Sequence, residues 1–230
     1  MMPRFGRLAD SKALSLMNKQ LLERKSRPTP SRGFLRRLFE RFTEEAMKAI
    51  IFSKDETRRR YHVRFGTDKI LIGLLHAPKN SIAAKVLEFM GIDPKDVSVE
   101  ADKIARRPAY VGMGREVEKT FAINTIDFPS NDYTLHTLEL SYQEARKLGH
   151  NYIGSGHLLL GLVSDEGCLA SLVLAKLDAN TSNIREEVLH MFGENNNEII
   201  LEMTSYQPTV EDVAKVHFII VNAFPLYITR

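Results

Sequence analysis

The sequence repeats itself at an offset of 88 residues, and this repeat constrains the fold more than any other feature. Residues 62–75 align with residues 150–163 without a gap, so that one histidine, two glycines and two leucines fall on identical residues. After one residue is dropped, residues 82–87 align with residues 169–174. Self-similarity of this kind indicates repeated structural units. The sequence therefore predicts two copies of one unit.

Each copy has the pattern of four helices. In the first copy Thr43 is suited to cap a helix, because Glu44 and Glu45 follow in the first turn, where negative charge is favourable. A short, strongly apolar second helix begins after Gly66, and its counterpart begins after Gly154. Helices this apolar are expected at the buried centre of each unit. The remaining helices are predicted at residues 81–90, 94–106, 134–148, 168–177 and 181–192. The predicted fold class is all-α.

The predicted organisation follows from these copies. It comprises a leader (1–37), a first copy (38–106), a linker loop (107–131), a second copy (132–193) and a divergent tail (194–230). The linker is predicted from its glycines and prolines. The tail is rich in β-branched and aromatic residues over 216–228, which leaves open a short strand, a partner-binding segment or disorder.

Charge is distributed unevenly along the chain. The net charge is +3, but the first 37 residues hold ten lysines and arginines against two acids, a net of +8, so the remainder carries −5. A basic, serine-containing and acid-poor leader is typical of an organellar transit peptide, to a plastid or alternatively a mitochondrion, and a basic tail that touches nucleic acid or lipid is the other interpretation. The acidic body argues against a nucleic-acid partner. The apolar runs are too short to cross a membrane.

Five stretches carry a family resemblance. These are residues 38–44, 82–92, 144–154, 157–162 and 183–196. They resemble the N-terminal Clp repeat domain of ClpC-type chaperones, and the last stretch is most similar to the plastid branch. The resemblance implies a duplicated four-helix Clp repeat that forms an eight-helix, pseudo-twofold domain. It also implies docking of adaptor and substrate proteins, which the family's ATPase rings unfold into the ClpP protease.

The sequence itself contains no phosphate-binding loop of the Gly-x-x-x-x-Gly-Lys-Ser/Thr type. The favoured interpretation is therefore a non-enzymatic interaction domain of the plastid stroma that needs no cofactor. Its expected partners are substrate or adaptor proteins or a ClpC/ClpP-type complex, without nucleic acid or membrane. The alternative is an N-terminal fragment of a full-length ClpC-type ATP-dependent unfoldase.

The resemblance also implies a ligand site. In bacterial members a carboxylate at the start of the second helix and a threonine at the start of the first recognise phosphorylated arginine. Thr43 matches the threonine, and Asp68 stands where the family has glutamate. Gly156 and Asn131 occupy these positions in the second copy, so that site is predicted to be lost. The alternative is that Thr43 and Asp68 only cap helices.

Aromatic, histidine and cysteine residues complete the candidates. Phe42 is predicted to be a core residue, whereas Phe39 is a candidate exposed anchor by resemblance. His62 and His150 precede the glycine turns and are expected to hold them by hydrogen bonds rather than to bind a metal, because no zinc-ligand spacing is present. Cys168, the single cysteine, is expected to be a small buried residue. No catalytic constellation is predicted.

Overall fold

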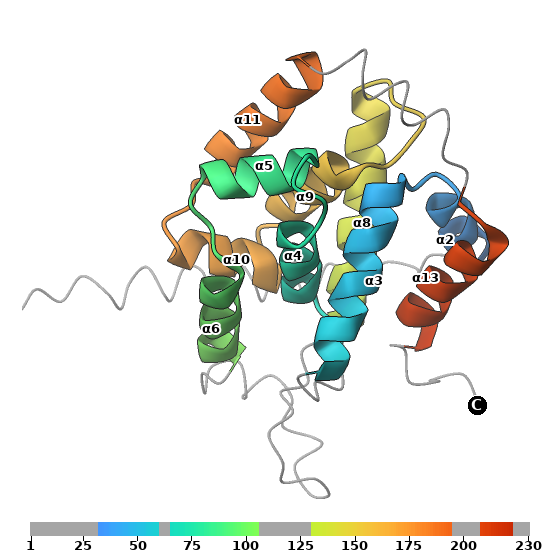
Figure 1. The fold of residues 1–230 in the computed structure, drawn as a ribbon, viewed down its shortest axis with the longest axis horizontal. Helices are drawn as coiled ribbons and strands as arrows, with labels where there is room; N and C mark the ends of the chain where they lie inside the picture. Colours follow the sequence, from blue (N-terminus) through green and yellow to red (C-terminus); the bar gives the residue numbers. More distant parts are fainter. Residues whose placement is uncertain (1–31, 60–64, 106–129, 195–207, 223–230) are drawn as a thin grey trace, which may run out of the picture. The chain divides into compact units, whose positions relative to one another are not determined.

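The computed structural model describes residues 32–59, 65–105, 130–194 and 208–222 (Figure 1). These residues are helical apart from turns and one isolated bridge. Their helices are α2 (Arg32–Phe39), α3 (Glu44–Arg59), α4 (Thr67–Leu75), α5 (Ile82–Phe89), α6 (Pro94–Ala105), α8 (Ser130–Lys147), α9 (Ser155–Ser164), α10 (Leu169–Lys176), α11 (Thr181–Glu194) and α13 (Val210–Asn222). The predicted all-α class is confirmed.

The duplication is visible helix by helix. Helices α3 to α6 correspond in order and register to α8 to α11. Even the ends match, because Ser81 caps α5 through a hydrogen bond from Ala84 N, and Cys168 caps α10 through one from Ser171 N. After α5 and α10 the chain turns through a positive φ at equivalent positions, Gly91 and Asp178. The two copies are therefore one backbone design with different side chains.

The third helix of each copy packs against the other copy. Helix α5 lies on α9 and α11, and α10 lies on α4 and α6. The first residue of each second helix also accepts a hydrogen bond from the start of the other copy's third helix. Thr67 Oγ1 accepts from Ala170 N of α10 at 3.2 Å, and Ser155 Oγ accepts from Ala83 N of α5 at 3.4 Å. Each of these contacts recurs with the copies interchanged. This exchange produces the predicted pseudo-twofold arrangement of eight helices and a shared core.

Two glycines allow the first and second helices of each copy to approach closely. A Cβ atom at Gly73 would collide with Ser53 Oγ and the Ala49 carbonyl, and one at Gly161 would collide with their equivalents, Ser141 Oγ and the Thr137 carbonyl. The two serine hydroxyls at this close approach are satisfied within their own helices, because each donates to the carbonyl four residues earlier. Helices α4 and α9 are thereby buried almost completely, as predicted.

Helix α2 takes up the last six residues of the predicted leader (1–37) and the first two of the predicted first copy. Leu35 and Leu38 of this helix are buried. An apolar face at the end of the predicted leader therefore joins the core despite the basic residues beside it. The transit peptide predicted for residues 1–37 lies mostly outside the described residues and remains a prediction.

The C-terminal tail also contributes a helix. Val213 and Val216 of α13 are buried, and α13 packs on α2 and α3. Thr209 begins it with a reciprocal bond, because its hydroxyl accepts from Asp212 N at 3.1 Å and donates to the Asp212 carboxylate at 2.7 Å. A strand over the first part of 216–228 is therefore wrong: capping and packing override the β-branched composition. Residues 223–230 lie outside the described residues.

The predicted linker, 107–131, falls mostly outside the described residues, and its last two residues belong to α8. Within the described helices, no single one is long and apolar enough to span a bilayer.

Candidate docking site at the second helices

Thr43 lies beside the second copy. Its hydroxyl accepts a hydrogen bond from Ala46 N at 3.3 Å, which confirms its role as the cap of α3. Its own N–H donates to the Ile153 carbonyl at 3.0 Å, and Ile153 N donates back to the Arg41 carbonyl at 2.7 Å. This short parallel bridge joins the start of α3 to the residues just before α9.

The start of α4 likewise lies beside the first helix of the other copy, α8. Thr134, in the first turns of α8, donates its hydroxyl to the Phe65 carbonyl at 3.2 Å. Each first helix therefore begins beside the second helix of the other copy. As a result Thr43 is joined to the start of α9, whereas Asp68 belongs to the start of α4, which α8 approaches. The structure thus gives the two residues different neighbours from the other copy.

Asp68 forms a buried ion pair. It stands in the first turn of α4 and is 6% exposed, and its carboxylate lies 3.0 Å from the ammonium of Lys69, which is 2% exposed. The helix has Gly66 as its N-cap without a side-chain cap hydrogen bond, so Asp68 does not cap α4 in the sense considered from sequence. A guanidinium that approached this carboxylate would compete with Lys69 for it.

The equivalent position in the second copy is closed. A Cβ atom at Gly156 would stand 2.8 Å from Phe192 Cζ and 3.0 Å from Ile82 Cγ2. Both of those side chains are buried. A carboxylate at this position would have to displace the aromatic ring of α11, which gives a steric reason for the glycine.

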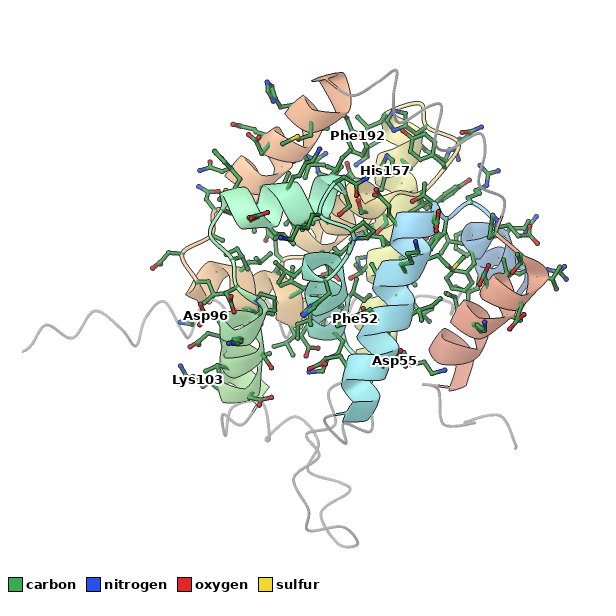
Figure 2. The ribbon with its side chains drawn as sticks, viewed as in Figure 1. Phe52, Asp55, Asp96, Lys103, His157 and Phe192 are labelled. Atoms are coloured by element: carbon green, nitrogen blue, oxygen red, sulfur yellow. The ribbon has the colours of Figure 1, made fainter. Side chains whose placement is uncertain are left out.

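A histidine fills the place that Lys69 has in the first copy. His157 is fully buried, and its Nδ1 accepts from Gly154 N at 3.0 Å. Its Nε2 lies 2.9 Å from His150 Nδ1, and its ring stacks on Phe192. Both His157 and Phe192 are labelled in Figure 2. Burial, followed by proximity to His150, lowers the pKa of His157 to about 3, and burial lowers the pKa of His150.

His150 was expected to hold its glycine turn. The structure instead joins its ring to His157, which in turn holds the N–H of Gly154. His62 lies outside the described residues. Among the described residues no group of three metal-ligating side chains is found.

Phe39 is not an exposed anchor. It is fully buried, and its ring meets Phe42 edge to face at a centroid distance of 5.3 Å. The expectation of exposure is wrong because α2, whose first six residues were predicted to be leader, carries Phe39 into the core. Phe42 is buried, as predicted.

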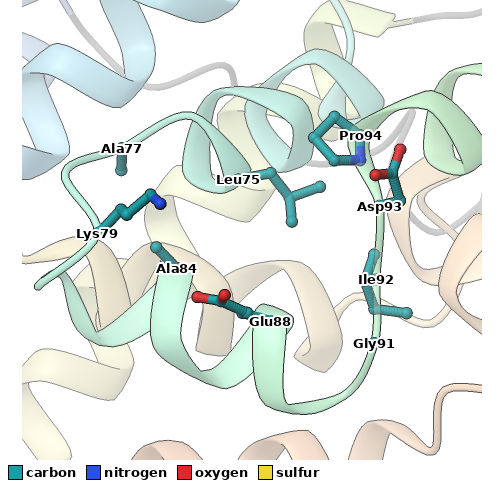
Figure 3. Close-up of a pocket in the computed structure, with 9 residues that line it drawn as sticks. All are labelled: Leu75, Ala77, Lys79, Ala84, Glu88, Gly91, Ile92, Asp93 and Pro94. Carbon is teal, nitrogen blue, oxygen red and sulfur yellow. The ribbon is translucent and has the colours of Figure 1, made fainter.

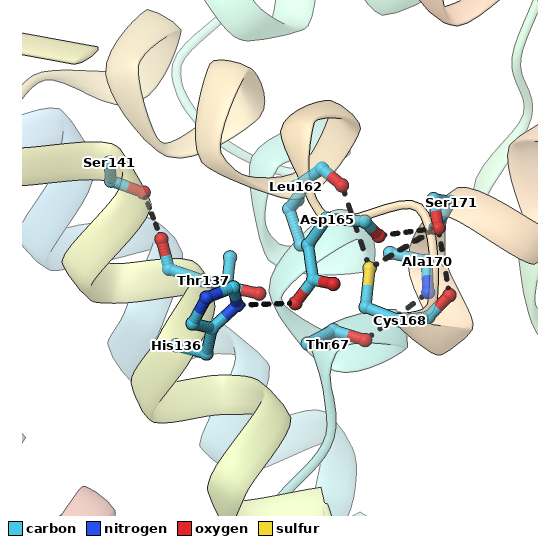
Figure 4. A network of polar contacts seen from close by, with 9 residues as sticks. All are labelled: Thr67, His136, Thr137, Ser141, Leu162, Asp165, Cys168, Ala170 and Ser171. Carbon is cyan, nitrogen blue, oxygen red and sulfur yellow. Dashed lines mark hydrogen bonds and ion pairs between the residues drawn. The ribbon is translucent and has the colours of Figure 1, made fainter. Parts of the chain in front are cut away.

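The end of α9 contains a second buried polar group (Figure 4). His136 Nδ1 lies 3.1 Å from the buried carboxylate of Asp165, and Ser171 donates to the Asp165 carbonyl at 2.7 Å. Cys168 is fully buried, as predicted, and burial, with nearby Asp165, raises the pKa of its thiol to about 11. This thiol is a helix cap rather than a nucleophile, because the reactive thiolate is strongly disfavoured.

A carboxylate also joins α8 to α11. Glu144 is 3% exposed and receives Arg185 at 2.7 Å and Lys147 at 2.8 Å. Burial alone would raise the pKa of Glu144, but the hydrogen bonds and charges of its two partners outweigh burial and lower it. Arg185 also reaches Ser164 at the end of α9.

A surface cleft of about 370 Å³ lies between α4, α5 and α6 (Figure 3). Its lining is mixed, with Leu75 and Ile92 beside Lys79, Glu88 and Asp93. Asp93 is committed to capping α6, because its carboxylate accepts from Lys95 N at 2.7 Å. The cleft therefore has no concentration of one charge or of apolar side chains.

Comparison with known families matches residues 131–215 to the Clp repeat (R) N-terminal domain. The chain is 44% identical over 187 residues to the chloroplastic ClpA homolog ATP-binding subunit of the ATP-dependent Clp protease from Brassica napus, which covers 79% of this chain and 20% of that protein. It is 46% identical over 166 residues to the chloroplastic chaperone protein ClpC1 of Arabidopsis thaliana, which covers 72% of this chain and 16% of that protein.

Among solved structures, the N-terminal domain of the caseinolytic protease associated chaperone ClpD from Arabidopsis thaliana is similar, at 24% identity and a TM-score of 0.45. That match covers 67% of this chain and 96% of the ClpD domain. Residues 131–215 therefore belong to the Clp repeat (R) N-terminal domain family. The relatives that the chain resembles are chloroplastic ClpC-type and ClpA-type proteins, of whose length the chain spans about a fifth.

Three residues that shape the site escaped the sequence analysis. The sequence could have pointed to Lys69, because a lysine in the first turn of a helix interacts unfavourably with the helix dipole unless it is paired. No local pattern marks Phe192 or Ser155, since their roles depend on which helices of the two copies pack together.

Proposed function

We propose that this chain is a non-catalytic protein-interaction domain of the Clp chaperone and protease system, located in the plastid. It binds substrate or adaptor proteins or docks on a ClpC/ClpP-type complex. The observation that carries the proposal is the 44–46% identity to chloroplastic Clp chaperones, over a region in which the chain matches the Clp repeat domain. The chloroplastic relatives favour the plastid and give no support to a mitochondrial location.

The second candidate is the N-terminal part of a longer, ATP-dependent ClpC-type unfoldase. It is favoured by the observation that the chain spans only about a fifth of its relatives. Mass spectrometry of the endogenous protein distinguishes the two. Peptides that extend past residue 230 into an ATPase module would establish the longer protein, and a product that ends near residue 230 would establish the separate domain.

Partner contacts are proposed at the starts of the second helices, with Thr43 beside α9 and Asp68 at α4. What supports this placement is their polar character at two helix starts, where backbone N–H groups favour anions. The Asp68–Lys69 ion pair limits binding at this position, because the carboxylate already has a cationic partner. A cationic group on a partner gains Asp68 only by replacing Lys69, so binding at this carboxylate is expected to be weak in the unaltered chain.

Affinity capture from plastid extract tests the proposed function. We expect the immobilised chain to recover ClpP-type or ClpC-type subunits. Recovery of neither, from an extract in which both are detected, would contradict it. The double variant Asp68→Asn, Lys69→Met, which leaves no unpaired charge buried, then tests the contact beside the exposed-site control Glu186→Gln. Only the double variant should change recovery. Calorimetric titration with free phosphoarginine asks separately whether that ligand binds at all.

A further inference from the structure

The two histidines before and within α9 form a hydrogen-bonded chain with one possible arrangement of protons. The Gly154 N–H can only donate, so His157 Nδ1, 3.0 Å away, accepts and carries no proton. The proton of the neutral His157 ring is therefore on Nε2, which lies 2.9 Å from His150 Nδ1. His150 Nδ1 accepts in turn, and the proton of the His150 ring is on Nε2.

The surroundings of the pair are aromatic. His157 stacks on Phe192 of α11 at a centroid distance of 4.6 Å, and His150 stacks on Tyr152 at 4.9 Å. His150 also meets the edge of Phe192 at 5.2 Å. Phe192 therefore contacts both rings, and through them α11 is connected to the N-terminal turn of α9.

Several charged groups of the helices packed on α9 are paired with one another. On α4 Asp68 pairs with Lys69, and on α8 Glu144 binds Arg185 of α11 and Lys147. On α3 Glu45 accepts from Ser155. Further charged side chains on these helices are the exposed Glu44–Lys48 pair and Asp55 of α3, the half-buried Lys54 and Glu56 of α3, the half-buried Glu139 and exposed Arg146 of α8, the exposed Lys85 and Glu88 of α5, Lys176 of α10, and Glu186 and His190 of α11, the half-buried Glu187 of α11, and the His136–Asp165 pair at the far end of α9. Apart from the two rings, Tyr152 is the titratable group in ring contact with both of them.

The hydrogen bonds that link Gly154, His157 and His150 cannot accommodate an added proton. If His150 gains a proton on Nδ1, two N–H donors face each other across 2.9 Å. If His150 Nδ1 instead donates to His157 Nε2, the His157 ring must carry its proton on Nδ1, where it faces the Gly154 N–H. Either outcome breaks a hydrogen bond at the start of α9 and places a positive charge against Phe192 without a carboxylate partner.

We propose that His150 and His157 form an acid-sensitive latch between α9 and α11, which opens when the pair takes up one proton. Opening detaches Phe192 from the rings and frees the C-terminal part of α11. At the equivalent position of the first copy, Lys69 stands in the place of His157 and is paired with Asp68.

Imidazole ¹⁵N resonances of the full chain test the proton arrangement. Near neutral pH, His157 should show an unprotonated Nδ1 and a protonated Nε2, and the ring should not titrate between pH 8 and about pH 5 while the fold is intact. A His157 ring that titrates near its ordinary pKa, with the Gly154 and α11 amide signals unchanged, would overturn the latch. This measurement needs no variant and holds even if the variants below fail to fold.

Amide hydrogen exchange tests the opening. After correction for the intrinsic pH dependence, opening of α11 around Phe192 should rise by up to about tenfold per pH unit below the ordinary histidine pKa. In His157→Asn the side-chain oxygen can replace Nδ1 as the acceptor, and this pH dependence should be lost. His190→Gln also removes one histidine, from an exposed position on α11, and should keep the wild-type dependence. Equal pH dependence in all three proteins would refute the proposal.

Discussion

The same turn begins α4 and α9, and the two copies use it differently. Both turns have a glycine N-cap followed by a hydroxyl residue that caps the third helix of the other copy. The next two residues diverge: Asp68 and Lys69 form a buried ion pair, whereas Gly156 and His157 make room for Phe192 and join His150. Both copies therefore keep the glycine and the hydroxyl that the exchanged packing uses, and differ at the two positions that follow.

The largest effect is expected from breaking the ion pair of the first copy. Lys69→Met leaves the Asp68 carboxylate buried without its partner and should lower the free energy of unfolding by about 3 to 5 kcal/mol. The double variant Asp68→Asn, Lys69→Met removes both charges and should recover most of this loss. Urea denaturation of the two proteins measures the difference. Equal stability of the single and double variants would show that the pair does not act as a unit.

The interhelical glycines should behave alike in the two copies. Gly73→Ala and Gly161→Ala both place a Cβ atom against a carbonyl and a serine hydroxyl of the preceding helix, and each should cost about 2 to 3 kcal/mol. Thermal unfolding monitored by circular dichroism gives both values. Sensitivity in one copy alone would mean that the helix pairs are not equivalent.

Acid should destabilise the second copy in two ranges. His157 has a lowered pKa in the folded protein, so the unfolded chain binds the extra proton as pH falls below about 6.5, and stability should decrease by roughly 1.4 kcal/mol per pH unit toward pH 3. The lowered pKa of Glu144 adds a loss that begins near its ordinary value of 4.5.

Urea denaturation at a series of pH values separates the two contributions. His157→Asn should flatten the stability curve over the upper range. Glu144→Gln should leave that range unchanged and flatten only the acidic end. A curve that is flat between pH 6.5 and pH 5 in the unaltered chain would contradict the assignment to His157.

The smallest effect belongs to surface charge. Lys48 of α3 pairs with Glu44 one turn earlier, and both side chains are more than half exposed. Lys48→Ala should change the free energy of unfolding by no more than about 0.5 kcal/mol. A loss of several kcal/mol in the same denaturation assay would show that this exposed pair matters as much as the buried one.

Local sequence patterns were sufficient for most of the fold. Caps such as Thr43, glycines at the helix ends and the repeat itself gave the class and nearly all the helix positions. What they could not give was which copy packs on which, because an internal repeat has the same pattern whether its third helices are exchanged or not.

The remaining errors arose from composition. Basic residues concealed the apolar face of α2 and with it the burial of Phe39, and β-branched residues concealed α13. In both segments tertiary packing decided the structure: α2 and α13 pack on each other, and α13 also packs on α3. A helix whose partner is distant in sequence leaves little local signal of that partner.

Because α5 and α10 are exchanged between the copies, the slowest amides of these two helices should open only when the whole shared core unfolds. Native-state hydrogen exchange measures this directly in the slowest amides of the two helices. We predict one common opening free energy, equal to that of global unfolding by urea. Slow amides of α10 that open at a distinctly lower free energy than those of α5, or the reverse, would show that the copies are independent and would contradict the shared core.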